Sequence, residues 1–241
     1  MLDSVLSSAL NALSMPISGS EVHVIAPWAY WHARLMVLSW GILLPIGVLI
    51  ARFYKITPSQ NWPHQVDNKL WWHSHRVFQW VGLALMSAGV WVMWGYAGSG
   101  TPAATTHGSI GWVLLAAGWL QALGSFARGT SGTPEEPGDH YLMTRKRLMF
   151  ERIHKFVGWS ALLASVIAIV LGLVIADAPR WMFLTMIVWW ITLAIVFVRL
   201  QRQGRCVDTY QAIWGPDPRH PGNKLKPIGW GIRRLQSLQK S

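Results

Sequence analysis

Five apolar stretches, each long enough to cross a lipid bilayer, constrain the fold of this chain more than any other feature. They cover roughly residues 27–53, 70–96, 107–127, 148–176 and 181–200. A membrane-spanning helix needs about 20 mainly apolar residues, and this chain is 52% hydrophobic and only 13% charged over its 241 residues. We therefore expect an all-α membrane protein with five transmembrane helices rather than a soluble domain.

The basic residues follow the membrane topology. Most of the 21 Lys and Arg residues fall in the first connection, the third connection and the C-terminal tail, which lie on one side of the five-span arrangement. By the positive-inside rule, that side is cytoplasmic and the N-terminus is outside. The net charge of +11 is thereby accounted for, and no nucleic-acid partner is expected.

Three parts are expected along the chain: an outer N-terminal segment at 1–26, a transmembrane core at 27–202 and a basic cytoplasmic tail at 203–241. Apolar residues at helical spacing in the first segment indicate a helix lying on the membrane surface. Four prolines prevent a long helix in the tail. Thr144 is predicted to cap the helix of the fourth span, because its hydroxyl can accept a free backbone N–H.

Each of the first four spans carries a histidine near its N-terminal end: His32, His75, His107 and His154. Consecutive spans run in opposite directions, so His32 and His107 share one level, the outer level, while His75 and His154 share the inner level. An ionisable side chain inside a membrane span is expensive and needs a reason to be there. A hydrogen-bonded packing role is the alternative for any single histidine, but four at matched levels favour a cofactor site.

Imidazoles from facing helices can ligate one haem iron between them. Glycines one or two turns after three of the histidines, at Gly82, Gly111 and Gly158, leave room for a flat macrocycle, although small residues also serve ordinary helix packing. With one cysteine and no C-x-x-C-H motif, the expected cofactors are two non-covalent b haems, one at each level. A separate metal site at His73 and His75 is the alternative to this assignment.

Basic side chains near the two levels suggest further roles. Arg34 at the outer level and Arg76 at the inner level can bind haem propionates, with snorkelling to the interface as the alternative. Arg52, Lys55 and Lys155 surround the inner level and form a candidate site for an anionic electron donor, although topology alone would also place basic residues there. The histidines outside the spans are expected at the surface: His23, His64, His140 and His220.

The histidine-containing stretches resemble the cytochrome b561 family, especially its DOMON-associated form. They read HARLMVLSWGILLPIGVLIARF, WWHSHRVFQWVG, HGSIGWVLLAAGWLQALGSFAR and ERIHKFVGWSALLASVIAIVLGL. The resemblance covers about residues 32–200 and implies a four-helix core with two bis-histidine haems, His32 pairing with His107 and His75 with His154. It also implies electron transfer from cytoplasmic ascorbate to an outer acceptor such as a ferric chelate.

This chain departs from the family in two respects. It lacks the helix that precedes the first ligand helix in six-helix members, so one flank is expected to need lipid, a homodimer partner or a larger membrane complex. The ascorbate-associated motifs are matched only at the basic end from Arg52 to Lys55, so the donor is expected to be ascorbate-like or another small molecule.

We interpret the chain as a transmembrane electron-transfer cytochrome of a bacterial inner membrane. One alternative is a quinol-reacting cytochrome b or the membrane anchor of a larger oxidoreductase. A second alternative is an accessory structural subunit of a membrane complex. Haem reduction that depends on added quinol, and not on ascorbate, distinguishes the first alternative. Co-purification of a stoichiometric partner distinguishes the second.

Overall fold

The computed structural model describes residues 1–20, 24–96 and 101–235. Within these ranges no strand is present, and five helical segments are long and apolar enough to cross a membrane. The prediction of an all-α, five-span protein is therefore confirmed. The expected surface position of His23 concerns a residue outside these ranges.

The spans are assembled from α-helices, with a π segment in the middle of the first span and 3-10 segments at the ends of the second and third. The first span consists of α2, η1 and α3; the second and third are α4 with η2 and α5 with η3; the fourth and fifth are α7 and α8. In chain order, the elements are α1 (Leu2–Ser14), α2 (Pro27–Met36), η1 (Val37–Leu43), α3 (Leu44–Phe53), α4 (Leu70–Met93), η2 (Trp94–Tyr96), α5 (Pro102–Gly124), η3 (Ser125–Ala127), α6 (Asp139–Leu142), α7 (Arg145–Ile175), α8 (Arg180–Arg202), α9 (Thr209–Trp214) and η4 (Pro221–Lys224).

Local capping sets where two of the spans begin. Thr144 accepts a hydrogen bond from the backbone N–H of Arg147, so the predicted cap of α7 is confirmed. Thr101 caps α5 in the same way, and Pro102 occupies the first helical turn, where its missing N–H costs nothing. The third span therefore starts at Pro102, earlier than the expected start at His107, which lies in the second turn of α5.

A proline in the first span creates the docking point for the last one. Pro45 has no N–H, so the carbonyl of Gly41, four residues earlier, has no helical donor at that position. The indole Nε1 of Trp189 in α8 donates to this carbonyl at 2.7 Å. Phe197, further along α8, contacts Phe53 with ring centroids 5.2 Å apart. The fifth span is thus anchored to the first through a carbonyl that proline leaves free.

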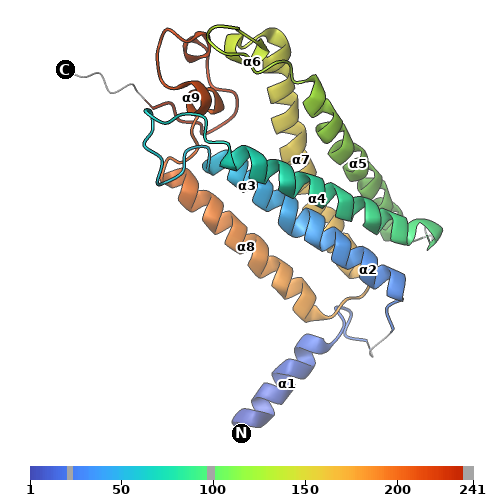
Figure 1. Ribbon diagram of the computed structural model, residues 1–241. Helices are drawn as coiled ribbons and strands as arrows, with labels where there is room; N and C mark the ends of the chain where they lie inside the picture. Colours follow the sequence, from blue (N-terminus) through green and yellow to red (C-terminus); the bar gives the residue numbers. More distant parts are fainter. Residues whose placement is uncertain (21–23, 97–100, 236–241) are drawn as a thin grey trace.

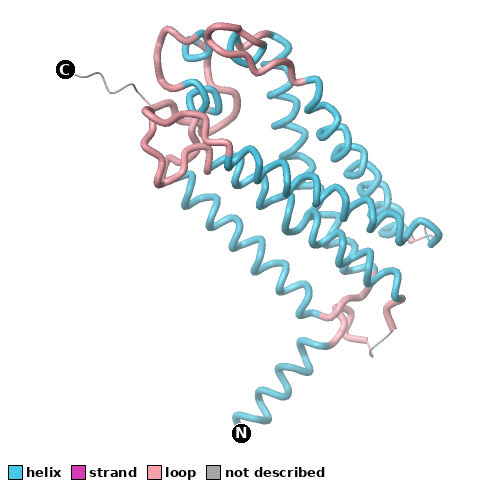
Figure 2. Tube along the Cα trace, viewed as in Figure 1, coloured by secondary structure: helices cyan, strands magenta, loops and turns pink. Residues whose placement is uncertain are grey.

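The four histidine-bearing spans form the centre of the bundle. Figure 1 shows α2 and α3 running beside α4, α5 running beside α7, and α8 on the side of the first span. The buried core lies where these pairs meet and consists of Trp40, Leu44, Leu83, Met86, Leu114, Ala161, Ala168, Ile169 and Met186. Loops gather at the two ends of the helices (Figure 2).

The helix predicted in the N-terminal segment is present as α1, which extends away from the bundle (Figure 1). Its apolar side chains are exposed, including Val5, Leu6 and Leu10. Where α1 meets the start of α8, the backbone N–H of Arg180 donates to the carbonyl of Met15 at 3.0 Å. Exposed apolar residues on a helix suit a membrane surface, and this location for α1 stays a prediction.

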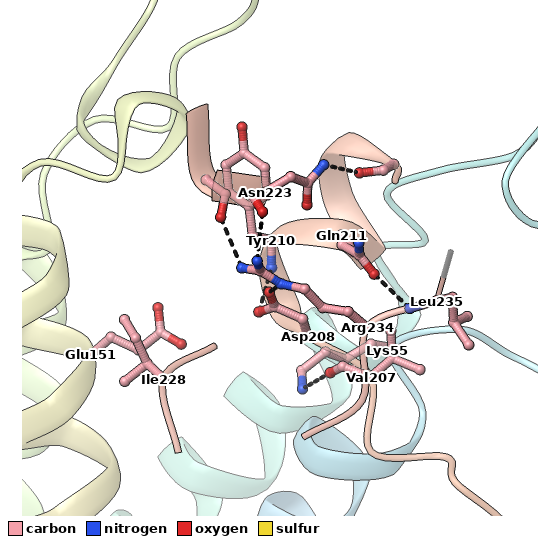
Figure 3. Close-up of polar contacts among 12 residues, drawn as sticks. Lys55, Glu151, Val207, Asp208, Tyr210, Gln211, Asn223, Ile228, Arg234 and Leu235 are labelled. Atoms are coloured by element: carbon pink, nitrogen blue, oxygen red, sulfur yellow. Dashed lines mark hydrogen bonds and ion pairs between the residues drawn. The ribbon is translucent and has the colours of Figure 1, made fainter. Parts of the chain in front are cut away.

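The segment expected to be a basic tail is folded over the inner-level end of the bundle. We call residues 203–235 the C-terminal cap. Asp208 caps the short helix α9 and forms an ion pair with Arg234 at 2.8 Å, and Arg234 also donates to the carbonyls of Gly222 and Asn223 (Figure 3). The Tyr210 side chain is 1% exposed. The sequence showed why a long helix is absent here, but not that the segment packs.

Candidate functional site

The structure brings the four span histidines together in two pairs. At the outer level, the ring centroids of His32 and His107 lie 6.0 Å apart with an interplanar angle of 75°. At the inner level, those of His75 and His154 lie 6.3 Å apart with an angle of 79°. Each pair joins a helix of the α2/α4 side to a helix of the α5/α7 side. These are the pairs expected from the alternating direction of the spans.

The spacing of the rings can be tested against the geometry of a shared metal ion. A metal bonded at about 2 Å to one nitrogen of each of two opposed imidazoles holds the ring centroids about 6 Å apart. The observed separations of 6.0 and 6.3 Å match this value. Both levels therefore fit bis-histidine ligation of one iron.

The protonation of three histidines follows from their hydrogen bonds. A backbone carbonyl only accepts, so an Nδ1 atom next to a carbonyl must carry the proton, which leaves the Nε2 lone pair for a metal. Each bond reaches to a neighbouring helix and so also orients the ring. Nδ1 donates from His32 to Gly89 at 3.0 Å, from His75 to Gly47 at 3.0 Å and from His107 to Ala168 at 2.9 Å.

His154 is positioned differently from the other three. Its ring stacks on Phe150, with centroids 5.4 Å apart and an interplanar angle of 22°. Its Nδ1 is buried and has no hydrogen-bond partner in the described part of the chain. Gln121 of α5 donates to the backbone carbonyl of His154 at 2.8 Å. Stacking and backbone contact thus orient this ring in place of an Nδ1 bond.

The three glycines predicted to make room for a macrocycle divide into two groups. A Cβ added at Gly111 would meet nothing within 4 Å, and one at Gly158 would meet only the amide of Gln121, at 3.5 Å. A Cβ at Gly82 would instead lie 2.7 Å from Cδ2 of Leu44. Gly111 and Gly158 therefore border space that a flat ring can use, while Gly82 allows α3 and α4 to pack closely.

An apolar layer separates the two levels. In α4, the buried residues Leu83 and Met86 lie between His75 and the turn that contacts His32. In α5, the buried Leu114 lies between His107 and the inner end of the helix. The two histidine pairs therefore lie on opposite sides of an apolar core.

The alternative metal site at His73 and His75 receives little support from the structure. Residues two apart on a helix point to different sides, and His73 is exposed while His75 faces Gly47 and His154. The ring pairs are thus the better-supported use of these histidines.

The two arginines proposed to bind haem propionates form cation–π contacts with aromatic rings of their own helices. The guanidinium of Arg34 lies 5.5 Å from the ring centroid of Tyr30 and 5.3 Å from that of Trp31. Arg76 lies 5.9 Å from the ring of Trp72. Both side chains are exposed, so they are accessible at the ends of the bundle where a carboxylate or the lipid interface can meet them.

The three basic residues predicted to bind an anionic donor lie together beneath the C-terminal cap. Arg52 donates to the carbonyl of Trp230 at 3.0 Å, and Lys55 donates to that of Val207 at 3.0 Å. Lys155 donates to the carbonyl of Ile228 at 2.5 Å. Figure 3 shows the cap segments that supply two of these carbonyls, at Val207 and Ile228. The cap therefore occupies hydrogen-bonding groups of all three side chains.

Burial changes the electrostatics of this basic group. Lys55 is only 6% exposed. Burial, followed by repulsion from the Lys155 ammonium, lowers the pKa of Lys55 to about 8. Glu151 supplies a buried negative charge, pairing with Lys155 at 2.6 Å and with Arg147 at 3.7 Å. Sequence reasoning missed Glu151, although its i,i+4 spacing from both basic residues was a usable signal.

The expected surface position of His140 is wrong. The side chain is 8% exposed, with its ring centroid 6.4 Å from that of Tyr210 and 6.2 Å from that of Trp214. Burial, and next the Arg147 guanidinium, lower the pKa of His140 to about 4. The cap residues Tyr210 and Trp214 cover this histidine, and the sequence around His140 does not predict that contact. His64, in contrast, is exposed as expected.

Comparison with known proteins finds relatives for the part of the chain that holds both ring pairs. The family model described as "Eukaryotic cytochrome b561" matches residues 31–178. A cytochrome b561, DM13 and DOMON domain-containing protein of Arabidopsis thaliana is 30% identical over 143 residues, which are 59% of this chain and 14% of the relative. No solved structure matches the chain significantly.

Two cytochrome b561 and DOMON domain-containing proteins of the same plant are also similar. One is 30% identical over 146 residues, covering 61% of this chain and 31% of the relative. The other is 32% identical over 143 residues, covering 59% of this chain and 27% of the relative. The matched part thus spans about a third or less of each of these relatives.

The family supports haem-based electron transfer across a membrane, with haem b as the cofactor and small redox molecules as partners. The five spans make the chain an integral, multi-pass membrane protein. A bacterial inner membrane stays a prediction, since the relatives described above are plant proteins. Because the family model covers more than half of the chain and includes all four paired histidines, this protein belongs to the cytochrome b561 family.

Proposed function

We propose that the chain carries single electrons across a membrane through two bis-histidine b haems. His32 and His107 would hold one haem, and His75 and His154 the other. The observation that carries this proposal is the pair of ring separations, 6.0 and 6.3 Å, at two levels divided by an apolar core. Haem supplies the one-electron redox chemistry when bound.

The chain's own residues set ligation, orientation and access. The carbonyls of Gly47, Gly89 and Ala168 fix three imidazoles with Nε2 available. Gly111 and Gly158 leave space beside the histidines of α5 and α7. Arg34 lies two residues after His32 and so points to a different side of α2. We therefore assign its exposed side chain to the lipid interface rather than to a propionate of the outer haem.

The direction of transfer in this proposal runs from a cytoplasmic donor at the inner level to an outer acceptor such as a ferric chelate. The positive-inside rule supports this orientation, because the basic connections adjoin the inner level. Arg52, Lys55 and Lys155 would attract an ascorbate-like anion there. Such a donor reaches them only where the cap carbonyls of Trp230, Val207 and Ile228 release their hydrogen bonds.

Haem counting on single variants tests the ligand assignment. Full-length protein made with ample haem and purified in detergent is expected to contain two b haems per chain. His32→Ala, His107→Ala, His75→Ala and His154→Ala should each lower the count to about one, because a bis-histidine site loses half of its protein ligands. His73→Ala is the matched control and should keep two. The proposal fails if all four variants retain both haems.

The covered basic group also favours a second candidate, a quinol-type donor. A quinol dissolves in the bilayer and does not need the hydrogen-bonding groups that the cap occupies. In proteoliposomes, reduction of the haems by an added quinol, with ascorbate ineffective at equal concentration, would support this candidate. The opposite preference would support the anionic donor.

A further inference from the structure

Two arginines from different spans meet at one tryptophan near the inner level. The guanidinium of Arg128, which directly follows η3, lies 4.5 Å from the ring centroid of Trp72, and that of Arg76 lies 5.9 Å from the same ring. In the described part of the chain neither arginine forms an ion pair. Two unneutralised guanidiniums held this close create a local excess of positive charge.

The charge of Arg76 affects Arg128. Burial, and next the Arg76 guanidinium, lower the pKa of Arg128. Stacking on Trp72 offsets part of this repulsion, since an aromatic face attracts a cation. An anion between the two guanidiniums would remove the repulsion altogether, and planar guanidinium groups suit the oxygens of a phosphate or carboxylate.

A groove on α4 is lined by one member of this charge pair, Arg76. It has a volume of about 340 Å³ and is lined by His73, Arg76, Val77, Trp80 and Val81. All five side chains are exposed, and their spacing places them on one face of the helix. Each residue advances about 100° around a helix. Arg76 therefore points well away from His75, and the centre of the groove lies nearly opposite it.

The order of polarity along the groove matches a lipid at a membrane surface. His73 and Arg76 lie nearer the start of α4, at the end of the span, while Val77, Trp80 and Val81 follow deeper along it. A phospholipid presents its phosphate at the interface and its acyl chains below. The ring of Trp119 in α5 flanks the apolar part, with its centroid 6.1 Å from that of Trp80.

We propose that this groove is a specific binding site for an anionic phospholipid. Arg76 and Arg128 bind the phosphate from two spans, and the apolar side chains of Val77, Trp80 and Val81 contact an acyl chain. The lipid thereby links the start of α4 to the end of α5. A haem propionate, the partner suggested for Arg76 by sequence, is disfavoured because the groove faces away from His75.

Native mass spectrometry tests the site on full-length protein. The protein is delipidated in detergent and offered equal amounts of phosphatidylglycerol and phosphatidylcholine with identical acyl chains. Wild-type protein should retain phosphatidylglycerol with a preference of about tenfold, as expected for charge-assisted hydrogen bonds. Arg76→Gln and Arg128→Gln should each abolish that preference. Arg145→Gln removes an exposed basic residue of α7 and should leave the preference unchanged.

Two further variant measurements distinguish a bound phospholipid from a haem propionate as the partner of Arg76. Arg76→Lys keeps a charge that can bind a phosphate and should retain part of the preference. Haem content should be the same in Arg76→Gln as in the wild type, because a phospholipid site is independent of the haems. If Arg76→Gln loses haem but keeps the lipid preference, the arginine serves a propionate and the lipid assignment is wrong.

The wild-type comparison alone can also overturn the proposal. Equal retention of phosphatidylglycerol and phosphatidylcholine would show that the groove does not select an anionic headgroup. A loss of preference in Arg145→Gln as large as in Arg76→Gln would reduce the effect to net charge. If the glutamine variants aggregate on gel filtration, Arg76→Lys and the wild type decide the question.

Discussion

Replacing two glycines by alanine in haem-free protein should separate helix packing from the space beside the histidines. At Gly82 in α4, an added Cβ would lie 2.7 Å from Cδ2 and 2.9 Å from Cγ of Leu44. Contacts below 3 Å require the buried Leu44 side chain, or α3 itself, to shift. Ser39 also donates to the Gly82 carbonyl at 2.7 Å, which holds α4 close to the first span. At Gly111 in α5, an added Cβ would meet nothing within 4 Å.

The size of the difference follows from these contacts. Both substitutions improve helix propensity by about 1 kcal/mol, and this gain cancels when the two variants are compared. Gly82→Ala adds the cost of overpacking, about 1 to 3 kcal/mol. The free energies of unfolding should therefore differ by about 2 kcal/mol in favour of Gly111→Ala. For a chain of this size, that is roughly 4 to 8 °C in melting temperature.

Thermal unfolding measures the effect directly. Both variants and the wild type are produced without haem, purified in the same detergent and unfolded by heating while circular dichroism is recorded. Gly82→Ala should melt below the wild type and Gly111→Ala above it. Equal shifts in the two variants would refute the assignment of Gly82 to helix packing and of Gly111 to open space.

Three further predictions concern the haem space and the cap. Gly111→Leu should fold but bind about one haem per chain instead of two by haem assay; two haems would contradict the space assigned to the macrocycle. His140, with its pKa lowered to about 4 from an ordinary 6.5, stabilises the fold in its neutral form, so about 3 kcal/mol of stability should be lost as pH falls from 6.5 to 4. Proteolysis of the cap at a series of pH values should report this loss of stability, and His140→Phe should reduce the loss. Equal pH profiles for the wild type and His140→Phe would refute the role given to His140. Asp208→Asn should leave Arg234 without its ion-pair partner and destabilise the cap by about 3 kcal/mol, seen as faster hydrogen exchange in α9; unchanged exchange would contradict the structural role of the pair.

Much of the candidate site was predictable because its signals are local. The lengths of the apolar runs indicate five spans, and the alternation of span direction pairs His32 with His107 and His75 with His154. The cap on α7 at Thr144 is likewise a short-range feature. The same reasoning could not tell which glycines serve helix packing and which leave space beside a histidine. Gly82, Gly111 and Gly158 look alike in sequence, and only the neighbouring helix shows whether an added Cβ has room.

The sequence by itself determined the membrane class, the number of spans and the two histidine levels, since hydrophobic length and helical period act within one segment. Only the tertiary structure decided that residues 203–235 form a cap, that Lys55 and His140 are buried, and that Arg76 meets Arg128. These features depend on contacts between residues far apart in the chain, such as Lys55 with Val207, 152 positions later. Such contacts follow from how the helices and the cap pack together, and no local pattern encodes them.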